Sequence, residues 1–555
     1  MKENAAILYH PEGYDTSRGK LMGRHAAGEG FLRGFVQHAG VDRFFACTET
    51  EEHFQQFQAV LTQLGSKTPA HWVPEARPEQ LAEAGAIFFP GPDLGKLAWK
   101  RNGRDPVAYS LTGVTHTICT HRVMDSIGEL LTAPVQEWDA LICTSPAVKQ
   151  GVDNILADYA QYLAERFGAP PVRARAQLPV IPLGVDCDAL EPGPGTKKSR
   201  RELRQRLKIS RDELVVLFFG RLSYHAKAHP LPMYVALEAA SRATGKKIVL
   251  IQAGWFANEP IRRAFEQGAQ TACPSVRSLY VDGRKAEFRK GIWHAADIFC
   301  SLSDNVQETF GLTPVEAMAA GLPVVASDWD GYRGTVQHDV TGLLVPTLMP
   351  APGSGANLAY RHHAGRDNYD QYIGYVSQSI AVDIGETARA FSTLIGNPEL
   401  RRDMGEKGKA RARSLFDWRV IVNQYQELWA DLSARRRAAA ANPPAARSSP
   451  LRGDPFTVFN HYSTRVLDER TRVTVAFPAP LETFNKLAAL GMNSFARGTF
   501  MPAEAIQALI LRLEQAGEGG LQVGGLLEDS DNGKRALFLR TLGWLCKLGI
   551  VTALP

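Results

Sequence analysis

The chain has 555 residues, of which 45% are hydrophobic and 22% are charged, and its 63 Lys and Arg residues exceed its 58 Asp and Glu residues by 5. This ordinary globular balance excludes wholesale disorder. The small net charge does not favour nucleic-acid binding, which needs a concentrated basic surface. At roughly 150 residues a domain, the length predicts three to four domains.

The apolar residues and the cysteines bear on where the protein works. The sequence contains no run of about 18 apolar residues, which a membrane-spanning helix would need. Its first residues do not have the pattern of a signal peptide. The seven cysteines are widely spaced, which is typical of free thiols in a reducing compartment. We therefore expect a cytoplasmic protein and leave open a peripheral contact with the inner face of the membrane.

Short apolar runs alternate with helical patterns twice along the chain. The first set comprises residues 5–8, 86–89, 107–113 and 140–144, and the second comprises residues 213–220, 247–254, 277–283, 297–302 and 322–328. Buried parallel strands joined by helices have this pattern. The predicted fold class is therefore α/β, with two Rossmann-like doubly wound domains. A Pro/Gly-rich and then charged segment after residue 190 separates them into residues 1–190 and 191–432.

A second boundary lies near the C-terminus. Residues 433–454 are rich in Ala, Pro and Arg without periodicity, which predicts a linker. Residues 455–555 have helical periodicity at 501–517 and 533–551, which predicts a small, mainly helical module, compatible with a winged-helix-like arrangement. From residue 452 on, 11 basic and 10 acidic residues give a charge of +1, so we expect protein contacts or oligomerisation rather than DNA binding.

Several polar segments are expected at the surface. Residues 347–379 interrupt the second domain and predict an exposed insertion that is helical near its end. His362 and His363 within it, the pair Asp304–Asn305 and the patch Asp529–Asp531 are expected to be solvated. None of them has partner residues at a metal-ligand spacing, so no metal site is expected.

Residues 304–346 carry the densest chemical pattern. Seven residues separate Glu308 from Glu316, and the turn between them is followed by Pro314, which fits the first turn of a helix ending near Gly321. Free backbone N–H groups in such a turn favour an anion, and carboxylates accept hydrogen bonds from sugar hydroxyls. A carboxylate for a ribose, amides for a diphosphate and a second carboxylate for a hexose together predict a nucleotide-sugar site.

This segment resembles the signature of the family-4 retaining glycosyltransferases, which have the GT-B fold of two Rossmann-like domains facing a cleft. Further matches follow in order at residues 137–152, 181–190, 217–230, 293–311 and 397–418, so the resemblance covers about residues 1–432 and not 433–555. It implies transfer of a hexose from a UDP- or GDP-sugar to an acceptor hydroxyl with retention and without a metal or cofactor. The resemblance also implies a role in polysaccharide or glycoconjugate assembly, with a sugar or glycolipid as the acceptor.

The resemblance also assigns donor-site residues. It implies that Glu316 binds the ribose and that Glu308 contacts the hexose without acting as a nucleophile. It implies that Arg221 and Lys227 hold the diphosphate, and a guanidinium and an ammonium after a strand can indeed clamp a leaving pyrophosphate. Ala228 stands where the family has a glycine. The remaining predicted donor contacts are Gly220, Thr309, Phe310, Gly311 and Leu312.

In the first domain the family places a His after a central strand. Residues 109–125 offer His116 and His121, and we favour His116, which follows the strand more directly. The remaining signal is a glycine-containing loop predicted after the first strand, where the backbone could approach an acceptor or a phosphate. A purely structural turn is the alternative for this segment, whose glycines are Gly23, Gly28 and Gly30.

Three other functions stay open at the level of the sequence. A phosphorylase-like or sucrose-synthase-like use of the same fold would need a second substrate site that no motif specifies. A non-catalytic nucleotide-sugar sensor could use the C-terminal module as its effector. A DNA-binding regulator acting through residues 455–555 is disfavoured by the charge of that module.

Overall fold

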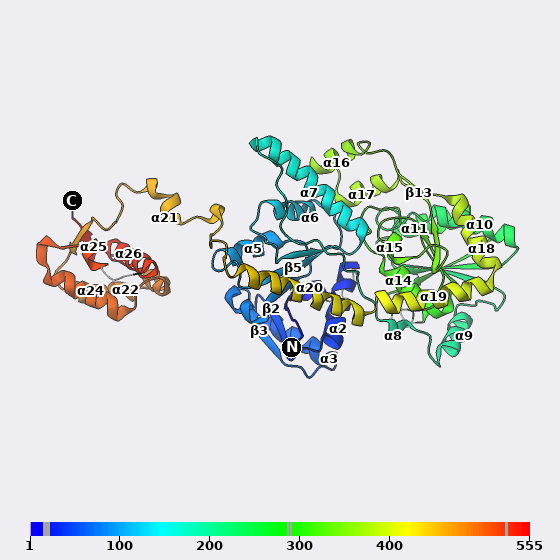
Figure 1. Cartoon of the computed structure of the whole chain (residues 1–555), viewed down its shortest axis with the longest axis horizontal. Coiled ribbons are helices and arrows are strands. Elements are labelled where there is room, and N and C mark those ends of the chain that lie inside the picture. The colour runs from blue at the N-terminus through cyan, green and yellow to red at the C-terminus, as the bar shows by residue number, and fades with distance from the viewer. Residues whose placement is uncertain (1, 15–22, 286–287, 289–290, 528–530, 555) are drawn as a thin grey trace. The chain divides into compact units, whose positions relative to one another are not determined.

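The computed structural model describes residues 2–14, 23–285, 288, 291–527 and 531–554. The chain forms two compact units, Met1–Ser449 and Pro450–Pro555. The larger unit contains two six-stranded sheets whose strands are all parallel (Figure 1). The predicted α/β class with two doubly wound domains is confirmed.

The first sheet has the strand order β3-β2-β1-β4-β5-β6 and is buried on both faces. Its strands are β1 (Ala6–Leu8), β2 (Phe44–Thr48), β3 (Ala70–Pro74), β4 (Ala86–Phe89), β5 (Ser110–Val114) and β6 (Ala140–Ile142). The helices between them are α1 (Pro11–Tyr14), α2 (Gly23–His38), α3 (Glu51–Gln63), α4 (Leu81–Ala84), α5 (Leu94–Asn102), α6 (His121–Gly128) and α7 (Pro146–Phe167). The predicted runs lie on β1, β4, β5 and β6, whereas β2 and β3 were not predicted.

The second sheet has the order β12-β11-β10-β7-β8-β9, the same order read from its other edge. Its strands are β7 (Leu214–Phe219), β8 (Ile248–Gly254), β9 (Arg277–Asp282), β10 (Ile298–Ser301), β11 (Val324–Ser327) and β12 (Gly342–Val345). The helices are α8 (Cys187–Leu190), α9 (Thr196–Arg206), α10 (Leu231–Thr244), α11 (Glu259–Ala272), α13 (Ile292–Ala295), α14 (Leu312–Ala319), α15 (Tyr332–Thr335), α18 (Ile384–Gly396) and α19 (Pro398–Leu415).

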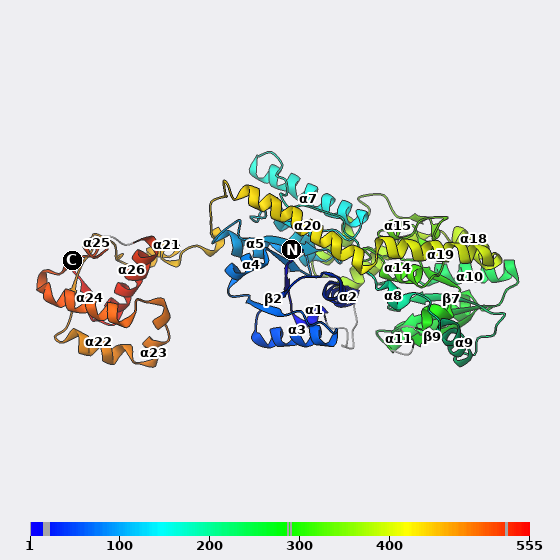
Figure 2. The same ribbon diagram turned by 60° about the horizontal axis from the view of Figure 1, so that its bottom comes forward.

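The end of the second domain's sequence returns to the first domain. Helix α20 (Trp418–Ala439) crosses from α19 to the first domain in both views (Figures 1 and 2). Its buried aromatic residues Trp418, Tyr425 and Trp429 pack with Phe31 and Phe35 of α2. The boundary expected at residue 432 is therefore wrong in part, because residues 418–439 complete the first domain's core. Residues 433–439, expected in the linker, continue this helix.

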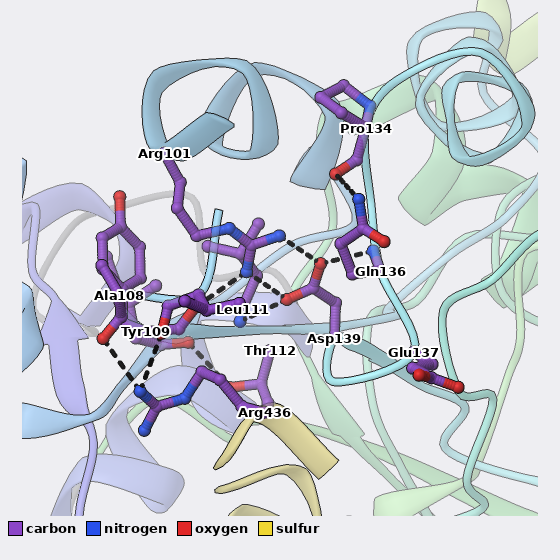
Figure 3. A network of polar contacts seen from close by, with 12 residues as sticks. Arg101, Ala108, Tyr109, Leu111, Thr112, Pro134, Gln136, Glu137, Asp139 and Arg436 are labelled. Carbon is purple, nitrogen blue, oxygen red and sulfur yellow. Dashed lines mark hydrogen bonds and ion pairs between the residues drawn. The ribbon is translucent and has the colours of Figure 1, made fainter. Parts of the chain in front are cut away.

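A buried ion pair joins strands and helices of the first domain (Figure 3). Arg101 at the end of α5 forms two hydrogen bonds to Asp139, of 2.6 and 2.7 Å, and both side chains are fully buried. Asp139 also accepts from the backbone N–H groups of Leu111 and Gln136. From α20, Arg436 donates to the carbonyl of Ala108. A buried charge pair is tolerated when its remaining hydrogen-bonding capacity is used, as it is for this carboxylate.

The smaller unit has its own hydrophobic core, formed around Val473, Ile510, Leu542 and Trp544. Its three-stranded antiparallel sheet has the order β16-β15-β17, with β15 (Arg472–Val475), β16 (Leu521–Gln522) and β17 (Val551–Ala553). The helices are α21 (Pro455–Val458), α22 (Pro480–Ala488), α23 (Gly491–Ser494), α24 (Ala503–Gln515), α25 (Val523–Leu526) and α26 (Asn532–Lys547). The mainly helical C-terminal module with short strands is thus present. None of the described helices is long and apolar enough to cross a bilayer.

Candidate active site

The strand order fixes where a ligand site belongs in each sheet. In open parallel sheets, ligands bind beyond the carboxyl ends of the strands where the strand order reverses. In the second sheet that point lies between the neighbouring strands β7 and β10. The segments that leave these two strands carry Lys227 and Glu308, so the fold itself brings together residues 81 positions apart.

Lys227 and Glu308 form an ion pair through Nζ and Oε2. Both side chains are largely buried, with 23% and 12% of their surfaces exposed. Burial alone would raise the pKa of Glu308, but the charge of Lys227 and the N–H groups of Thr309 and Phe310 outweigh it and hold the pKa below its usual range. The site therefore contains a carboxylate that stays ionised, next to an ammonium group.

The turn after Glu308 is fixed by Gly311, which caps the N-terminus of α14. Gly311 has φ +89°, and a Cβ at this position would lie 2.2 Å from the ring of Tyr332. Only glycine satisfies both conditions. The Tyr332 hydroxyl lies 2.8 Å from that of Ser301 and 3.5 Å from Glu308 Oε2. Pro314 lies in the first turn of α14 and Gly321 follows its end with φ +80°, as the motif predicted.

Thr309 connects the donor loop to the first domain. Its hydroxyl donates to the carbonyl oxygen of His116, and its own carbonyl accepts a hydrogen bond of 2.8 Å from Ser145 Oγ. Ser145 is the N-cap of α7, where its hydroxyl also accepts from Val148 N. The backbone after β5 and the start of α7 therefore face the loop between the two glutamates. Ser145 was not predicted, although its position before Pro146 marks a helix start.

The other predicted donor residues lie on the same edge. Gly220 ends β7 with φ +154°, and Glu316 is half-buried on α14. The Arg221 guanidinium donates 2.8 Å to the carbonyl oxygen of Ala226 within its own loop. Burial lowers the pKa of Arg221, and the nearby Asp370 and Tyr369 act in the opposite direction. The side chain of Arg221 is thus approached by a segment that the sequence did not place here.

That segment is the insertion, which forms β13 (Thr347–Leu348), α16 (Ala356–His363), α17 (Tyr369–Ser377) and β14 (Ala381–Val382). Figure 1 shows α16 and α17 in the region where the two domains meet. Ile373 is fully buried with Cys119 and Ala226, which belong to different domains. The expectation of a merely exposed insertion is wrong in part, because α17 packs between the domains.

The histidines of this region also differ from expectation. The ring of His362 stacks on His121 at 4.0 Å between centroids and on Tyr372 at 4.7 Å. His362 is therefore not a solvated residue, and His121 contacts the insertion. His116, the histidine that we favoured, is half-buried. Its backbone carbonyl oxygen accepts the hydrogen bond from the Thr309 hydroxyl.

The prediction of a glycine-containing loop after the first strand is wrong for the residues that the structure describes. Gly23, Gly28 and Gly30 lie in α2, and the residues directly before Gly23 lie outside the described part of the chain. A Cβ on Gly28 would lie 2.2 Å from the Gly13 carbonyl oxygen, and one on Gly30 would lie 3.1 Å from the Trp418 ring. These two glycines allow close helix packing rather than approach of a ligand.

Asp304 and Asn305 are not a surface patch, because only 2% and 1% of their surfaces are exposed. Asn305 donates 2.8 Å to the His225 carbonyl, and Asp304 accepts from the N–H of His229, so both brace the loop that carries Lys227. Asp529 and Ser530 of the other patch lie outside the described residues. Among the residues that the structure describes, no group of three or more His, Cys, Asp or Glu is arranged to hold a metal ion.

Two six-stranded parallel sheets, with a charged site at the switch point of the second and a loop contacting the first, define the class of GT-B proteins. Residues 199–350 match the family model described as glycosyl transferases group 1. This segment, which contains Arg221, Lys227, Glu308 and Glu316, is therefore a group 1 glycosyltransferase domain.

Curated relatives are named D-inositol 3-phosphate glycosyltransferase. The chain is 29% identical to the Geodermatophilus obscurus protein over 276 residues, which cover 44% of this chain and 55% of the relative. It is 30% identical to the Nocardia farcinica protein over 304 residues, covering 53% and 57% respectively. The chain thus spans about half the length of these relatives.

Among solved structures, the crystal structure of Anabaena Alr3699/HepE in complex with UDP is similar in fold. The TM-score is 0.50 and the identity 19%, over 78% of this chain and all of the other. A second structure of that protein, with UDP and glucose, has the same TM-score and 18% identity. At this low sequence identity, the comparison shows that the two proteins share a fold.

Proposed function

We propose that the protein is a retaining glycosyltransferase that moves a hexose from a nucleotide-sugar to an acceptor hydroxyl without a metal ion. The observation that carries this proposal is the buried Lys227–Glu308 pair at the switch point of a group 1 glycosyltransferase domain. Such a pair supplies both a cation for a leaving diphosphate and a carboxylate for a sugar hydroxyl, in a site where burial strengthens each interaction.

Each residue has a definite role in this proposal. Glu316 accepts hydrogen bonds from the ribose, while Lys227 and Arg221 neutralise the diphosphate as negative charge develops on it. Glu308 positions the hexose. The bond between the anomeric carbon and the diphosphate breaks while the acceptor oxygen bonds from the same face, and the acceptor's proton passes to the leaving phosphate oxygen.

UDP-sugars are the first donors to test, because the fold neighbour was crystallised with UDP. The names of the curated relatives make inositol phosphates the first acceptors to test. The first domain would hold the acceptor, since the backbone of His116 and the start of α7 meet the donor loop there. Contact between the domains excludes water and limits hydrolysis of the donor.

The test is release of nucleoside diphosphate from UDP- and GDP-hexoses by the full chain, with and without an acceptor. We expect slow hydrolysis of one donor by the wild type, with a loss of at least tenfold in Glu316→Ala and Lys227→Ala. Glu399→Ala, an exposed change on α19, is the matched control and should behave as wild type. Absence of both turnover and binding would refute the proposal, while binding without turnover in every mixture would favour the sensor.

A further inference from the structure

Asp330 occupies a strained position next to the donor loop. It lies between β11 and α15 with φ +47°, a left-handed conformation that residues other than glycine rarely adopt. The next residue, Gly331, is fixed against the donor loop, because a Cβ there would lie 2.5 Å from the Thr309 carbonyl oxygen. The backbone of Asp330 is thus held beside the segment that follows Glu308.

One oxygen of the Asp330 carboxyl group makes no hydrogen bond with the described residues. This oxygen, Oδ2, is sealed from solvent. A buried carboxyl oxygen without a hydrogen-bond partner is costly, so its presence in a native protein calls for an explanation, such as a functional role. Strain and an orphaned acceptor at one residue therefore point to a requirement beyond stability.

The pKa of Asp330 reflects both its burial and the charges of other groups. Burial, and then the negative charge of Glu308, raise the pKa of Asp330 to about 8, while the Gly331 amide and Lys227 act in the opposite direction. Asp330 in turn contributes, after burial, to the raised pKa of Cys119 in the first domain. The negative charge of Glu308 and burial therefore act in the same direction on the pKa of Asp330.

We propose that Asp330 binds a hydroxyl group of the donor hexose beside Glu308 and so contributes to the choice of sugar. A carboxyl group can accept a hydrogen bond from a hydroxyl or, when protonated, donate one to it. Two carboxyl groups on one sugar fix its orientation better than one. This inference rests on the proposed function, since it needs a sugar held at Glu308.

The test compares a nucleotide with its sugar derivative on the full chain. Binding of UDP, GDP, UDP-glucose and GDP-mannose is measured by calorimetry for the wild type, Asp330→Asn and Asp330→Gly. Glycine adopts a positive φ without strain, so Asp330→Gly removes the carboxyl group without loss of thermal stability. Asp328→Asn, an exposed change in the same loop, is the matched control.

We expect both Asp330 variants to lose at least tenfold in affinity for the sugar derivative that the wild type binds, while the affinity for the matching nucleoside diphosphate changes less than twofold. An equal loss for both ligands, or no loss, would overturn the role of Asp330 and leave the proposed function standing. A selective effect on the KM of the acceptor would also overturn it. If the wild type binds none of the four probes, the proposed function fails, and the role of Asp330 with it.

Discussion

The hydroxyl of Tyr369 lies 3.2 Å from the sulfur of Cys119 and donates a hydrogen bond of 3.0 Å to Gln307. Cys119 belongs to the first domain, and Gln307 immediately precedes Glu308. One side chain of the insertion thus connects the first domain to the donor loop, through contacts that the length of the insertion alone did not suggest.

Removing this hydroxyl in Tyr369→Phe should weaken the connection without leaving a cavity. A hydrogen bond contributes about 1 kcal/mol, so we expect a fall in the melting temperature of a few degrees at most. Turnover should fall more than donor affinity, because the contact joins the domains rather than holding the donor. Kinetics with the identified donor check this. Tyr375→Phe, an exposed tyrosine on the same helix, is the control, and equal behaviour of the two variants would contradict the prediction.

The Lys227–Glu308 pair should behave as a unit. Removing one partner leaves a largely buried charge, so Lys227→Met and Glu308→Gln should each lower the free energy of unfolding by about 2–3 kcal/mol. The double variant should lose less than the sum, with a coupling of about 1–2 kcal/mol. Denaturant unfolding measures this. The exposed pair Lys149–Asp153 should give a coupling below about 0.5 kcal/mol, and similar couplings for both pairs would argue against burial as the cause.

Gly311 should not tolerate a side chain. Gly311→Ala forces a left-handed backbone on alanine and a clash with Tyr332, so we expect a loss of about 3 kcal/mol in stability and disruption of the donor loop. Gly396→Ala is the control, because no atom lies within 4 Å of its added Cβ. Thermal unfolding and nucleotide binding check both variants. Loss of binding with unchanged stability would point to a direct ligand contact instead.

Asp304 should make the protein less stable at higher pH. Burial raises the pKa of Asp304 to about 7, whereas an unfolded chain has about 3.9. The folded state therefore holds a proton between about pH 4 and 7 that the unfolded state has lost. Stability from this group is fully present below about pH 4 and decreases as pH rises to about 7, by at most about 4 kcal/mol.

The variant Asp304→Asn tests this sign. Asparagine can still accept the hydrogen bond from His229, so the variant should unfold at a higher temperature than the wild type at pH 8, and the difference should shrink toward pH 4. Unfolding curves from pH 4 to 8 measure it. Asp42→Asn, an exposed change, should leave the pH profile unaltered. A variant less stable than wild type at pH 8 would contradict the prediction.

The sequence predicted most of the strands that are buried on both faces, because a continuous apolar run such as that of β7 is typical of a strand in a parallel sheet. It missed β2, which is short although fully buried, and β3, whose residues are mostly half-buried at the sheet edge and end in a proline, a residue atypical of strands. The glycines of α2 were interpreted as a loop because a glycine needed for close packing looks the same in sequence as one needed for a turn.

By itself, the sequence determined the two α/β domains, the Lys227 and Glu308 motifs and the turn at Gly311, since local spacing and residue chemistry suffice for these. Only the tertiary structure decided that Lys227 pairs with Glu308, that α20 completes the first domain and that Tyr369 reaches Cys119. It also revealed the unpartnered carboxyl oxygen of Asp330. The physical reason is that burial and pairing arise between segments far apart in the chain, where no periodicity records which side chains will meet.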